Sequence, residues 1–374
     1  MKVGVLGAGQ LGQMLAQAGQ SLDLEFVFYD HNPDACAGQV GELIVGEFDD
    51  QQKLTAFAQQ VDVVTVEFEN VPIAALNHVA RMVPVFPDPS AFKVAQDRLT
   101  EKQFFTSLNI LTPDFYAIDS AAGLVDLLVS HKEPLILKSR RLGYDGKGQV
   151  SLDKATNALE AWALLGQVPA IAEQRIKFKR EVSIVAVRSQ SGDTRYYPLI
   201  ENVHENGILK RSRVNLYDGL QAKAEQYVHQ VLTALNYVGV LAFEFFDVDG
   251  ELVANEIAPR VHNSGHWTIE GASTSQFENH LRAILNKPLG DTQVAALCVM
   301  YNIIGSKPDL ALLQKVPDTY LHYYGKVERP GRKLGHVTLK ASTEQNAIAV
   351  QQILEGRSQS DLLDAVVHHI HKVL

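Results

Sequence analysis

Residues 240–267 read VLAFEFFDVDGELVANEIAPRVHNSGHW, and the rest of the chain can be interpreted around this stretch. Residues 240–246 and 252–257 are rich in β-branched and aromatic side chains, a composition that strands favour. The Asp249-Gly250 step between them is a strong signal for a hairpin turn. The stretch therefore predicts two antiparallel strands joined by a short loop.

Two glutamates, Glu244 and Glu256, lie one on each predicted strand. An odd-length loop centred near Gly250 would pair them directly on one face, whereas a two-residue Asp249-Gly250 loop would oppose Glu244 to Asn255. Two neighbouring carboxylates in a half-buried setting repel each other, so a divalent cation is their natural partner. The sequence leaves the register open, and a plain solvated hairpin is the alternative interpretation.

The composition favours an enzyme that acts on small molecules. The 374 residues suffice for two or three domains, and 46% hydrophobic and 21% charged residues are ordinary proportions for a globular enzyme. The formal net charge of -9 disfavours a nucleic-acid-binding surface. Cys36 and Cys298 lie far apart and predict neither a disulfide framework nor a thiolate metal site. Because the sequence contains no secretory leader and no apolar run of about 18 residues, we expect a cytoplasmic protein without a membrane partner.

The N-terminal region predicts a Rossmann-like unit. A strand at 2–6 leads into the turn GAGQLG at 7–12, and the second strand ends at Asp30. This pattern satisfies the dinucleotide fingerprint, so NAD binding is one interpretation; a turn that packs helix against strand or binds another phosphate is the other. The alternation then continues and predicts a parallel sheet covered by helices on both faces. Further strands are expected at 43–45, 61–68 and 83–86, and helices at 13–21, 51–60 and 73–79.

A second domain is predicted to begin after Pro87, Asp88 and Pro89. One long helix is expected from 90 to 108. A later buried strand ends in Lys138 and is followed by the loop SRRLGYDGKGQ. Glycines let backbone N–H groups approach phosphate oxygens, and a lysine at the base of the loop adds a point charge, so a lid over a nucleotide is one interpretation. A solvated basic loop is the other.

Residues 170–174 predict an apolar strand whose backbone can contact the edge of a nucleobase. Glu181, at the start of the next strand, is placed to hold ribose hydroxyls, although isolated glutamates such as Glu173 and Glu181 are more often ordinary strand-end residues. A strand at 196–200 and a polar turn at 201–209 are expected next. A lone histidine such as His204 is usually structural.

The remaining segments predict two amphipathic helices, at 221–237 and 275–285, and a small mixed module after them. The basic turn PGRKLGH at 330–336 is interpreted equally well as a phosphate site or as a solvated loop. The histidines at 368–371 lack acidic or cysteine companions, so we expect no metal site there. The expected elements of the module are strands at 295–304, 319–324 and 337–341 and a helix at 344–354.

The order of these features resembles the ATP-grasp superfamily. Within it, the sequence is similar to the 5-(carboxyamino)imidazole ribonucleotide synthase family over essentially the whole chain. The segments that carry this resemblance are GAGQLG at 7–12, GYDGKGQ at 143–149, NEIAPRVHNSGHWT at 255–268 and PGRKLGH at 330–336.

This resemblance implies an α/β and α+β architecture with an ATP-grasp fold in three parts. A Rossmann-like parallel-sheet domain would occupy residues 1–95. The ATP-grasp domain would follow at 96–290, with a small lid subdomain at about 113–175. A mixed α+β module at 291–374 would complete the substrate site.

The activity that the resemblance implies is ATP-dependent carboxylation of 5-aminoimidazole ribonucleotide with bicarbonate, via carboxyphosphate, in purine biosynthesis. Glu244 and Glu256 would bind magnesium, with two ions expected. The implied ATP contacts are Arg98, Lys138, Gly143, Tyr144, Asp145, Gly146, Lys147, Gly148, Gln149, Glu173, Gln174, Arg175, Ile176, Glu181, His204, Asn255 and Glu256.

The second substrate needs its own pocket next to the γ-phosphate. The candidate contacts are Gln10, Leu11, Glu67, Tyr144, Asp145, Arg260, His262, Asn263, Ser264, Lys326, Arg332 and Lys333. The candidate catalytic residues are Arg260, to stabilise carboxyphosphate, Asp145, to orient or deprotonate the amine, and Lys138. The family resemblance further suggests a homodimer.

Three alternatives remain at this point. The first is an NAD-dependent oxidoreductase, which leaves residues 240–267 without a role. The second is an ATP-grasp ligase with a different acceptor or one-carbon donor. The third is a nucleotide-binding regulator without turnover, which the set of two glutamates and a lysine disfavours.

Overall fold

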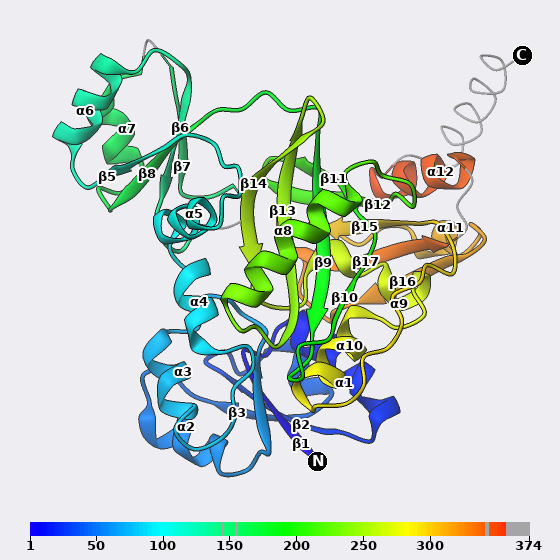
Figure 1. The fold of residues 1–374 in the computed structure, drawn as a ribbon. Coiled ribbons are helices and arrows are strands. Elements are labelled where there is room, and N and C mark those ends of the chain that lie inside the picture. Colours follow the sequence, from blue (N-terminus) through cyan, green and yellow to red (C-terminus); the bar gives the residue numbers. More distant parts are fainter. Residues whose placement is uncertain (144–145, 154–155, 341–343, 357–374) are drawn as a thin grey trace, which may run out of the picture.

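The computed structural model describes residues 1–143, 146–153, 156–340 and 344–356, which form three β-sheets with helices packed around them (Figure 1). The N-terminal sheet and a small antiparallel sheet project at opposite ends of a large central sheet. No helix in these ranges has both the length and the apolar character that a membrane crossing requires. The mixed α/β architecture expected from the sequence is confirmed.

The N-terminal sheet is parallel, with the strand order β3-β2-β1-β4, as the alternation of apolar runs predicted. Met14 and Leu15 of its first helix pack in one buried cluster with Phe277 and Leu281, which belong to a helix of the central region. This shared core fixes the sheet against the rest of the protein. Its elements are β1 (Lys2–Leu6), α1 (Gln10–Gly19), η1 (Gln20–Leu22), β2 (Glu25–Asp30), η2 (Cys36–Gln39), β3 (Glu42–Val45), α2 (Gln51–Ala58), β4 (Val63–Val66) and α3 (Ile73–Val79).

Two expectations about the end of this domain are wrong. The strand expected at 83–86 is reduced to a single bridge between Val64 and Val85, since Pro84 has no N–H to donate to a ladder. The single helix expected from 90 to 108 is split into α4 (Pro89–Ala95) and α5 (Arg98–Ser107). The break occurs because the side chain of Asp97 caps α5, accepting hydrogen bonds from the N–H groups of the second and third residues of that helix.

The small sheet is antiparallel, with the order β5-β8-β6-β7, and two helices cover one side of it. We call this unit the lid subdomain. Its strands β6 and β7 flank the Gly-rich loop. Residues 144–145 of this loop, and residues 154–155 after β7, lie outside the described ranges. The elements are β5 (Phe115–Ile118), α6 (Ala121–Ser130), β6 (Leu135–Ser139), β7 (Gln149–Leu152), α7 (Ala158–Leu164) and β8 (Ala170–Gln174).

The large sheet has the order β14-β13-β9-β11-β12-β15-β17-β16, and β10 pairs with β9. The strands near the C-terminus continue the central sheet through the pairing of β12 with β15, so they do not form a separate sheet. The elements are β9 (Arg180–Arg188), β10 (Thr194–Tyr196), β11 (Ile200–Glu205), β12 (Ile208–Val214), α8 (Gln221–Ala234), β13 (Gly239–Val248), β14 (Glu251–Ala258), η3 (Asn263–Gly265), α9 (Thr268–Gly271), α10 (Gln276–Ile284), β15 (Cys298–Ile304), α11 (Leu310–Leu313), β16 (Thr319–Tyr323), β17 (Lys333–Lys340) and α12 (Glu344–Leu354).

Two expectations about the central sheet are also wrong. Residues 201–209 are not a polar turn but the hairpin of β11 and β12, and its tip is Asn206-Gly207, where both residues have a positive φ. An Asn-Gly pair is itself a hairpin signal, and the polar side chains around it obscured the strands. The basic turn expected at 330–336 is shorter, because β17 already begins at Lys333.

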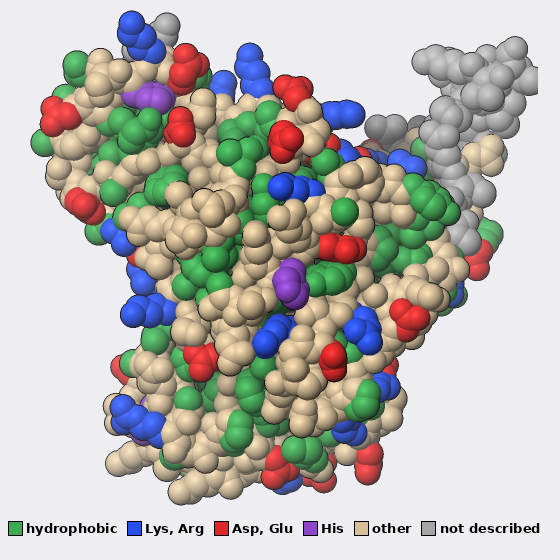
Figure 2. Space-filling view, in the orientation of Figure 1, with side chains coloured by type: hydrophobic (Ala, Val, Ile, Leu, Met, Phe, Trp, Pro, Cys, Tyr) green, Lys and Arg blue, Asp and Glu red, His purple; other side chains and the backbone are tan. Residues whose placement is uncertain are grey.

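Charged side chains of both signs are interspersed over the face of the molecule shown in Figure 2. The outline narrows between the lid subdomain and the N-terminal sheet. The two cysteines, Cys36 and Cys298, are free and buried.

Candidate active site

The turn of the acidic hairpin has two residues. Val248 pairs with Glu251, which leaves Asp249 and Gly250 as the loop. Their φ angles are 52° and 89°. Positive values at both positions are what a type I′ turn requires, and this turn matches the twist of the flanking strands. Of the two registers that the sequence left open, the two-residue loop is therefore the one that forms.

A β-bulge then changes the register before the strands reach Glu244. On the far side of the bulge the strands pair as the other register would have them, so Glu244 faces both Asn255 and Glu256. The register changes between the pairs Phe245–Ala254 and Phe243–Ile257. The extra residue on β14 brings Glu256 to the side that Glu244 occupies.

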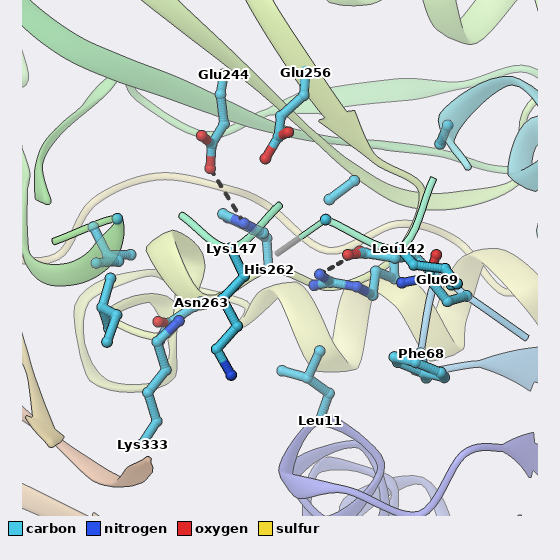
Figure 3. Close-up of a pocket in the computed structure, with 18 of the residues that line it drawn as sticks. Leu11, Phe68, Glu69, Leu142, Lys147, Glu244, Glu256, His262, Asn263 and Lys333 are labelled. Atoms are coloured by element: carbon cyan, nitrogen blue, oxygen red, sulfur yellow. Dashed lines mark ion pairs between the residues drawn. The ribbon is translucent and has the colours of Figure 1, made fainter. Parts of the chain in front are cut away.

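Glu244 and Glu256 hang side by side from β13 and β14 over one cavity of about 960 Å³ (Figure 3). Its walls come from the hairpin, α5, the lid loop, the first turn of α1 and the segment that leads into β17. The cavity thus brings together segments that are hundreds of residues apart. The sequence-predicted site residues that line it are Gln10, Leu11, Glu67, Arg98, Gly143, Lys147, His204, Glu244, Glu256, Arg260, His262, Asn263, Lys326, Arg332 and Lys333.

The two carboxylates lie in different electrostatic environments. Burial and the neighbouring Glu256 raise the pKa of Glu244 to about 7. The pKa of Glu256 is lowered, because Arg98, whose Nη1 lies 2.8 Å from its Oε2, outweighs the desolvation of the carboxylate. The pair therefore has less positive charge nearby than two ionised carboxylates require.

The side chain of His262 lies next to Glu244, with its Nε2 atom 3.3 Å from the Oε1 atom of the carboxylate. Its pKa is lowered well below the usual value by burial and by Arg260 and Lys333. The N–H of Ser264 donates to Nδ1, so the neutral ring carries its proton on Nε2, facing Glu244. A neutral donor solvates this carboxylate without neutralising it.

A buried ionic cluster lies where the lid subdomain meets α5. Glu173, on β8, receives Lys138 from β6 at 2.6 Å and lies 4.0 Å from Lys102 of α5. Burial alone would raise the pKa of Glu173, but the two lysines outweigh it and lower the pKa to about 2. The cluster places a permanent negative charge behind the strand-end cation Lys138.

Glu181 and His204 form an ion pair across β9 and β11. Burial would lower the pKa of His204, but its hydrogen bond to Glu181 and the field of Glu244 raise it. The structure therefore joins two residues that the sequence presented as isolated. It also explains why His204 opens onto the cavity although a lone histidine is usually structural.

The other sequence-predicted residues that the structure describes do not line this cavity. Ser264 is fully buried, and its hydroxyl accepts a hydrogen bond of 2.9 Å from Ser183, so it supports the loop after β14 from behind. Tyr144 and Asp145 lie outside the described residues, as do the histidines at 368–371. The described residues that belong to this group are Lys138, Gly146, Gly148, Gln149, Glu173, Gln174, Arg175, Ile176, Glu181, Asn255 and Ser264.

The Gly-rich turn at 7–12 binds the protein's own carboxylates. Glu67 accepts hydrogen bonds from the N–H groups of Gly9 at 2.9 Å and Gly12 at 3.4 Å, and Asp30 accepts one from Ala8 at 2.9 Å. A Cβ added at Gly9 would lie 2.9 Å from Glu67. The N–H groups that would bind a dinucleotide pyrophosphate are thus already used, and the NAD interpretation is wrong.

Basic side chains gather at the end of the cavity opposite the hairpin. Lys326 donates to Gln10, and its pKa is lowered by burial and by the nearby Arg332 and Lys333. Arg260 pairs with Glu69. Asn263 exchanges two amide hydrogen bonds, of 3.0 and 2.7 Å, with Asn302 of β15, which fixes its side chain at the wall. This end has the chemistry of a site for a phosphorylated small molecule.

Sequence reasoning missed several residues at the site. Lys102 is the most informative, because it follows Arg98 by four residues and so shares its helical face, a spacing that could have revealed it. Glu69 follows the predicted contact Glu67 by two residues and pairs with Arg260. Residues that line the cavity without a clear signal in the sequence include Phe68, Asn70, Glu101, Arg140, Leu142, Ile208 and Arg329.

The arrangement can bring two anionic substrates together. The paired carboxylates would hold a divalent cation, which would neutralise phosphate charge, and the basic end suits a phosphorylated acceptor. His262 lies next to the paired carboxylates on the loop that follows β14 (Figure 3), and Arg260 of the same loop also lines the cavity. Such a site is suited to transferring a phosphoryl group near the acceptor and away from bulk water.

Comparisons with known proteins agree with this geometry. Residues 1–96 match the ribonucleotide synthetase preATP-grasp domain, residues 103–277 the ATP-grasp domain, and residues 298–350 the phosphoribosylaminoimidazole carboxylase C-terminal domain. The three families follow one another along the chain.

Whole-chain relatives give the same result. The N5-carboxyaminoimidazole ribonucleotide synthase of Pseudomonas aeruginosa is 52% identical over 360 residues, which is 95% of this chain and 100% of the relative. A crystal structure of the synthetase from Thermus thermophilus is 49% identical with a TM-score of 0.89, covering 94% of this chain and 98% of that one. The synthase from Aspergillus clavatus, solved with ADP and 5-aminoimidazole ribonucleotide, is 31% identical with a TM-score of 0.86, covering 97% and 98%. The chain belongs to the N5-carboxyaminoimidazole ribonucleotide synthase family of ATP-grasp ligases.

Proposed function

We propose that the protein uses ATP to carboxylate 5-aminoimidazole ribonucleotide with bicarbonate, forming N5-carboxyaminoimidazole ribonucleotide with release of ADP and phosphate, in purine biosynthesis. The observation that carries this proposal is that the acidic hairpin and the basic end open onto the same cavity. Membership of the family supports it independently.

ATP would lie between the lid subdomain and the central sheet. Residues 173–176 would frame the adenine. Glu181 would hold the ribose, and its ion pair with His204 would orient its carboxylate. Arg98, Lys138 and the loop at 143–149 would bind the triphosphate. Lys138 is well suited to this task, because its ion pair with Glu173, at 2.6 Å, fixes the ammonium at the end of its strand.

Glu244 and Glu256 would hold magnesium. The fit rests on their charge: two carboxylates share one face, and the raised pKa of Glu244 marks a deficit of positive charge there. No group of three or more His, Cys, Asp or Glu side chains in the described ranges is arranged to hold a metal ion. Magnesium suits such a sparse site, because it commonly takes one or two carboxylates and completes its shell with water and substrate phosphates. When bound, it would neutralise charge on the phosphates. The sequence-based expectation of two ions stays a prediction.

The aminoimidazole ribonucleotide would occupy the opposite end of the cavity. Lys326, Arg332 and Lys333 supply charge for its phosphate, and Gln10 and Glu67 supply polar contacts from the N-terminal sheet. Glu67 is buried and its pKa is raised by desolvation, despite the hydrogen bonds it accepts from the Gly-rich turn. The glycines thus serve the second substrate by presenting an acid, not by binding a cofactor.

The chemistry would proceed in two steps. A bicarbonate oxygen attacks the γ-phosphorus of ATP, the bond to the β-γ bridging oxygen breaks, and carboxyphosphate and ADP form. The exocyclic amine then takes the carboxyl carbon, directly or as CO2, while phosphate leaves and the amine loses a proton. Arg260 would stabilise the charge on carboxyphosphate and on the departing phosphate, because it lines the cavity onto which both ends open.

The test is ADP release from the purified protein with ATP and magnesium. Adding 5-aminoimidazole ribonucleotide and bicarbonate together should stimulate ADP formation strongly, and Glu256→Gln should abolish most of the stimulation while the protein stays folded. If the two substrates do not stimulate the wild type, the proposed reaction is wrong. Replacing bicarbonate by formate, or the aminoimidazole by other amines, identifies a different ligase of the same superfamily.

We further infer a homodimer, from the family resemblance, and a cytoplasmic location, from the scarcity of cysteine. Sedimentation equilibrium tests the first inference directly. A monomer at micromolar concentration would contradict it.

A further inference from the structure

The outer edge of the acidic hairpin has no strand beside it. β14 is the terminal strand of the large sheet, so its outward-facing backbone groups need other partners. One partner is a backbone group: the N–H of Ala254 donates to the carbonyl of Leu111 at 2.7 Å. Further partners are the side chains of two consecutive residues of α5, Glu101 and Lys102.

Lys102 and Glu101 take the backbone groups on either side of Glu256. The ammonium of Lys102 donates to the carbonyls of Ala254 at 3.1 Å and Asn255 at 2.6 Å. The Oε1 atom of Glu101 accepts the N–H of Ile257 at 2.8 Å. These contacts fall at the β-bulge, where the register of β13 and β14 changes. Each replaces a ladder hydrogen bond that the bulged edge strand lacks.

Both residues are withdrawn from solvent, Glu101 with 2% and Lys102 with 1% of its surface exposed. Burying two ionisable side chains is expensive, and well-packed apolar residues would stabilise this helix face at least as well. Glu101 reaches the wall of the cavity, whereas Lys102 does not line it. Its ammonium also lies 4.0 Å from Glu173, so it joins the hairpin to the lid strand β8. General stability alone does not account for this arrangement.

We propose that Glu101 and Lys102 are positioning residues that hold the β-bulge and so keep Glu256 beside Glu244. This inference rests on the proposed function, since it concerns the same carboxylate pair. Helix α5 then acts at three points of one face, because residues 98, 101 and 102 follow the i, i+3, i+4 spacing. Arg98 contacts the carboxylate of Glu256, and its two neighbours hold the backbone before and after that residue.

A matched pair of substitutions at Glu101 tests the idea. Glu101→Gln keeps an oxygen acceptor for the N–H of Ile257, whereas Glu101→Met fills similar volume without one. Lys102→Met removes both donors to the bulge. We expect Glu101→Met and Lys102→Met to raise the magnesium concentration for half-maximal ADP formation by about tenfold or more. Glu101→Gln should remain within about threefold of the wild type, because its side chain can still accept the hydrogen bond.

One further readout and one control variant separate positioning from simple destabilisation. The KM for 5-aminoimidazole ribonucleotide should be unchanged, since its proposed site is at the other end of the cavity. Lys93→Met, an exposed lysine on α4, is the control for the charge change and should behave as the wild type. If activity falls only with the folded fraction, and the magnesium midpoint does not move, the inference is overturned. Should Lys102→Met fail to fold, the Glu101 pair decides.

Magnesium-dependent binding of ADP, measured by calorimetry, distinguishes this failure from failure of the proposed reaction. It needs no turnover, so it reports on the carboxylate pair even if another acceptor is used. If Glu101→Met and Lys102→Met both keep the magnesium dependence of ADP binding that the wild type shows, the positioning role alone is contradicted.

Discussion

The guanidinium of Arg98 lies 2.8 Å from the carboxylate of Glu256, across 158 residues of sequence. This contact joins the first turn of α5 to the acidic hairpin and holds Glu256 ionised. It also aligns the helix that carries Glu101 and Lys102. The active-site carboxylates thus depend on a helix that precedes them by a whole subdomain.

Replacing Arg98 should therefore impair the acidic end of the site. In Arg98→Met the pKa of Glu256 should rise, because its main counter-charge is lost, and ADP formation should fall by about 100-fold or more. Arg98→Lys, which keeps the charge but not the planar donor group, should lose less. Steady-state kinetics at saturating magnesium measures the effect. Equal losses in the two variants would show that charge at this position is not what matters.

The Gly-rich turn should not tolerate a side chain at Gly9. A Cβ there would lie 2.9 Å from Glu67, so Gly9→Ala should destabilise the protein by about 1–3 kcal/mol and raise the KM for the aminoimidazole substrate. Gly123→Ala is the matched control, because its Cβ would meet only Ser120, at 3.6 Å, in a helix that alanine favours. Denaturant unfolding should separate the two variants. If Gly9→Ala is as stable as the control, Glu67 is not held against the turn.

Lys138 should act through both charge and position. Lys138→Met removes the hydrogen-bonded cation of Glu173 and leaves Lys102 and the more distant Arg98, so the pKa of Glu173 should rise from about 2, and the KM for ATP should increase by about tenfold or more. The KM for the aminoimidazole substrate should change little. Lys138→Arg should restore part of the ATP affinity. An unchanged KM for ATP in the methionine variant would remove Lys138 from the nucleotide site.

His280 should make stability depend on pH. It is buried with a pKa lowered to about 3, and its Nδ1 accepts the N–H of Val240 while Nε2 contacts Thr65 of the N-terminal sheet. Because the pKa of His280 is lower in the folded protein, the unfolded chain takes up a proton at a higher pH than the folded protein does. The contribution of His280 to the free energy of unfolding is therefore complete above pH 6.5. It is lost as the pH falls toward 3, by about 1.4 kcal/mol per pH unit.

The check is urea unfolding between pH 7 and pH 5. His280→Gln should be less stable than the wild type at pH 7, but it should lose about 2 kcal/mol less across this range, because it has no proton to take up. Other buried histidines, among them His266 and His336, titrate in the same direction and remain in both proteins. Parallel pH profiles would contradict the assignment.

The sequence predicted most elements because their determinants are local. The parallel N-terminal sheet follows from alternating apolar runs, and the stripe on α8 is buried as its spacing predicted, with Val228, Val231 and Leu232 inaccessible to solvent. The failures at β11 and β12 have a local cause as well. The Asn206-Gly207 turn signal was present, but the polar faces of both strands masked it.

The site was predictable in its residue types but not in its connections. In sequence, the glycines at 7–12 fit a dinucleotide-binding turn as well as a turn that packs helix against strand. The structure excludes the first, because Glu67, at the end of β4, accepts the N–H groups of Gly9 and Gly12. Glu181 and His204 gave weak signals separately and became an ion pair only through the pairing of β9 with β11. No local pattern encodes a contact between distant strands.

The acidic hairpin shows where this division lies. The sequence by itself determined a hairpin with an Asp249-Gly250 turn and a glutamate on each strand, because turn chemistry and strand propensity act over a few residues. Only the tertiary structure decided that the two glutamates share a face. The turn alone would oppose Glu244 to Asn255, and the β-bulge that corrects this is bonded by side chains of α5, which are about 150 residues away in the chain but packed against it in the fold.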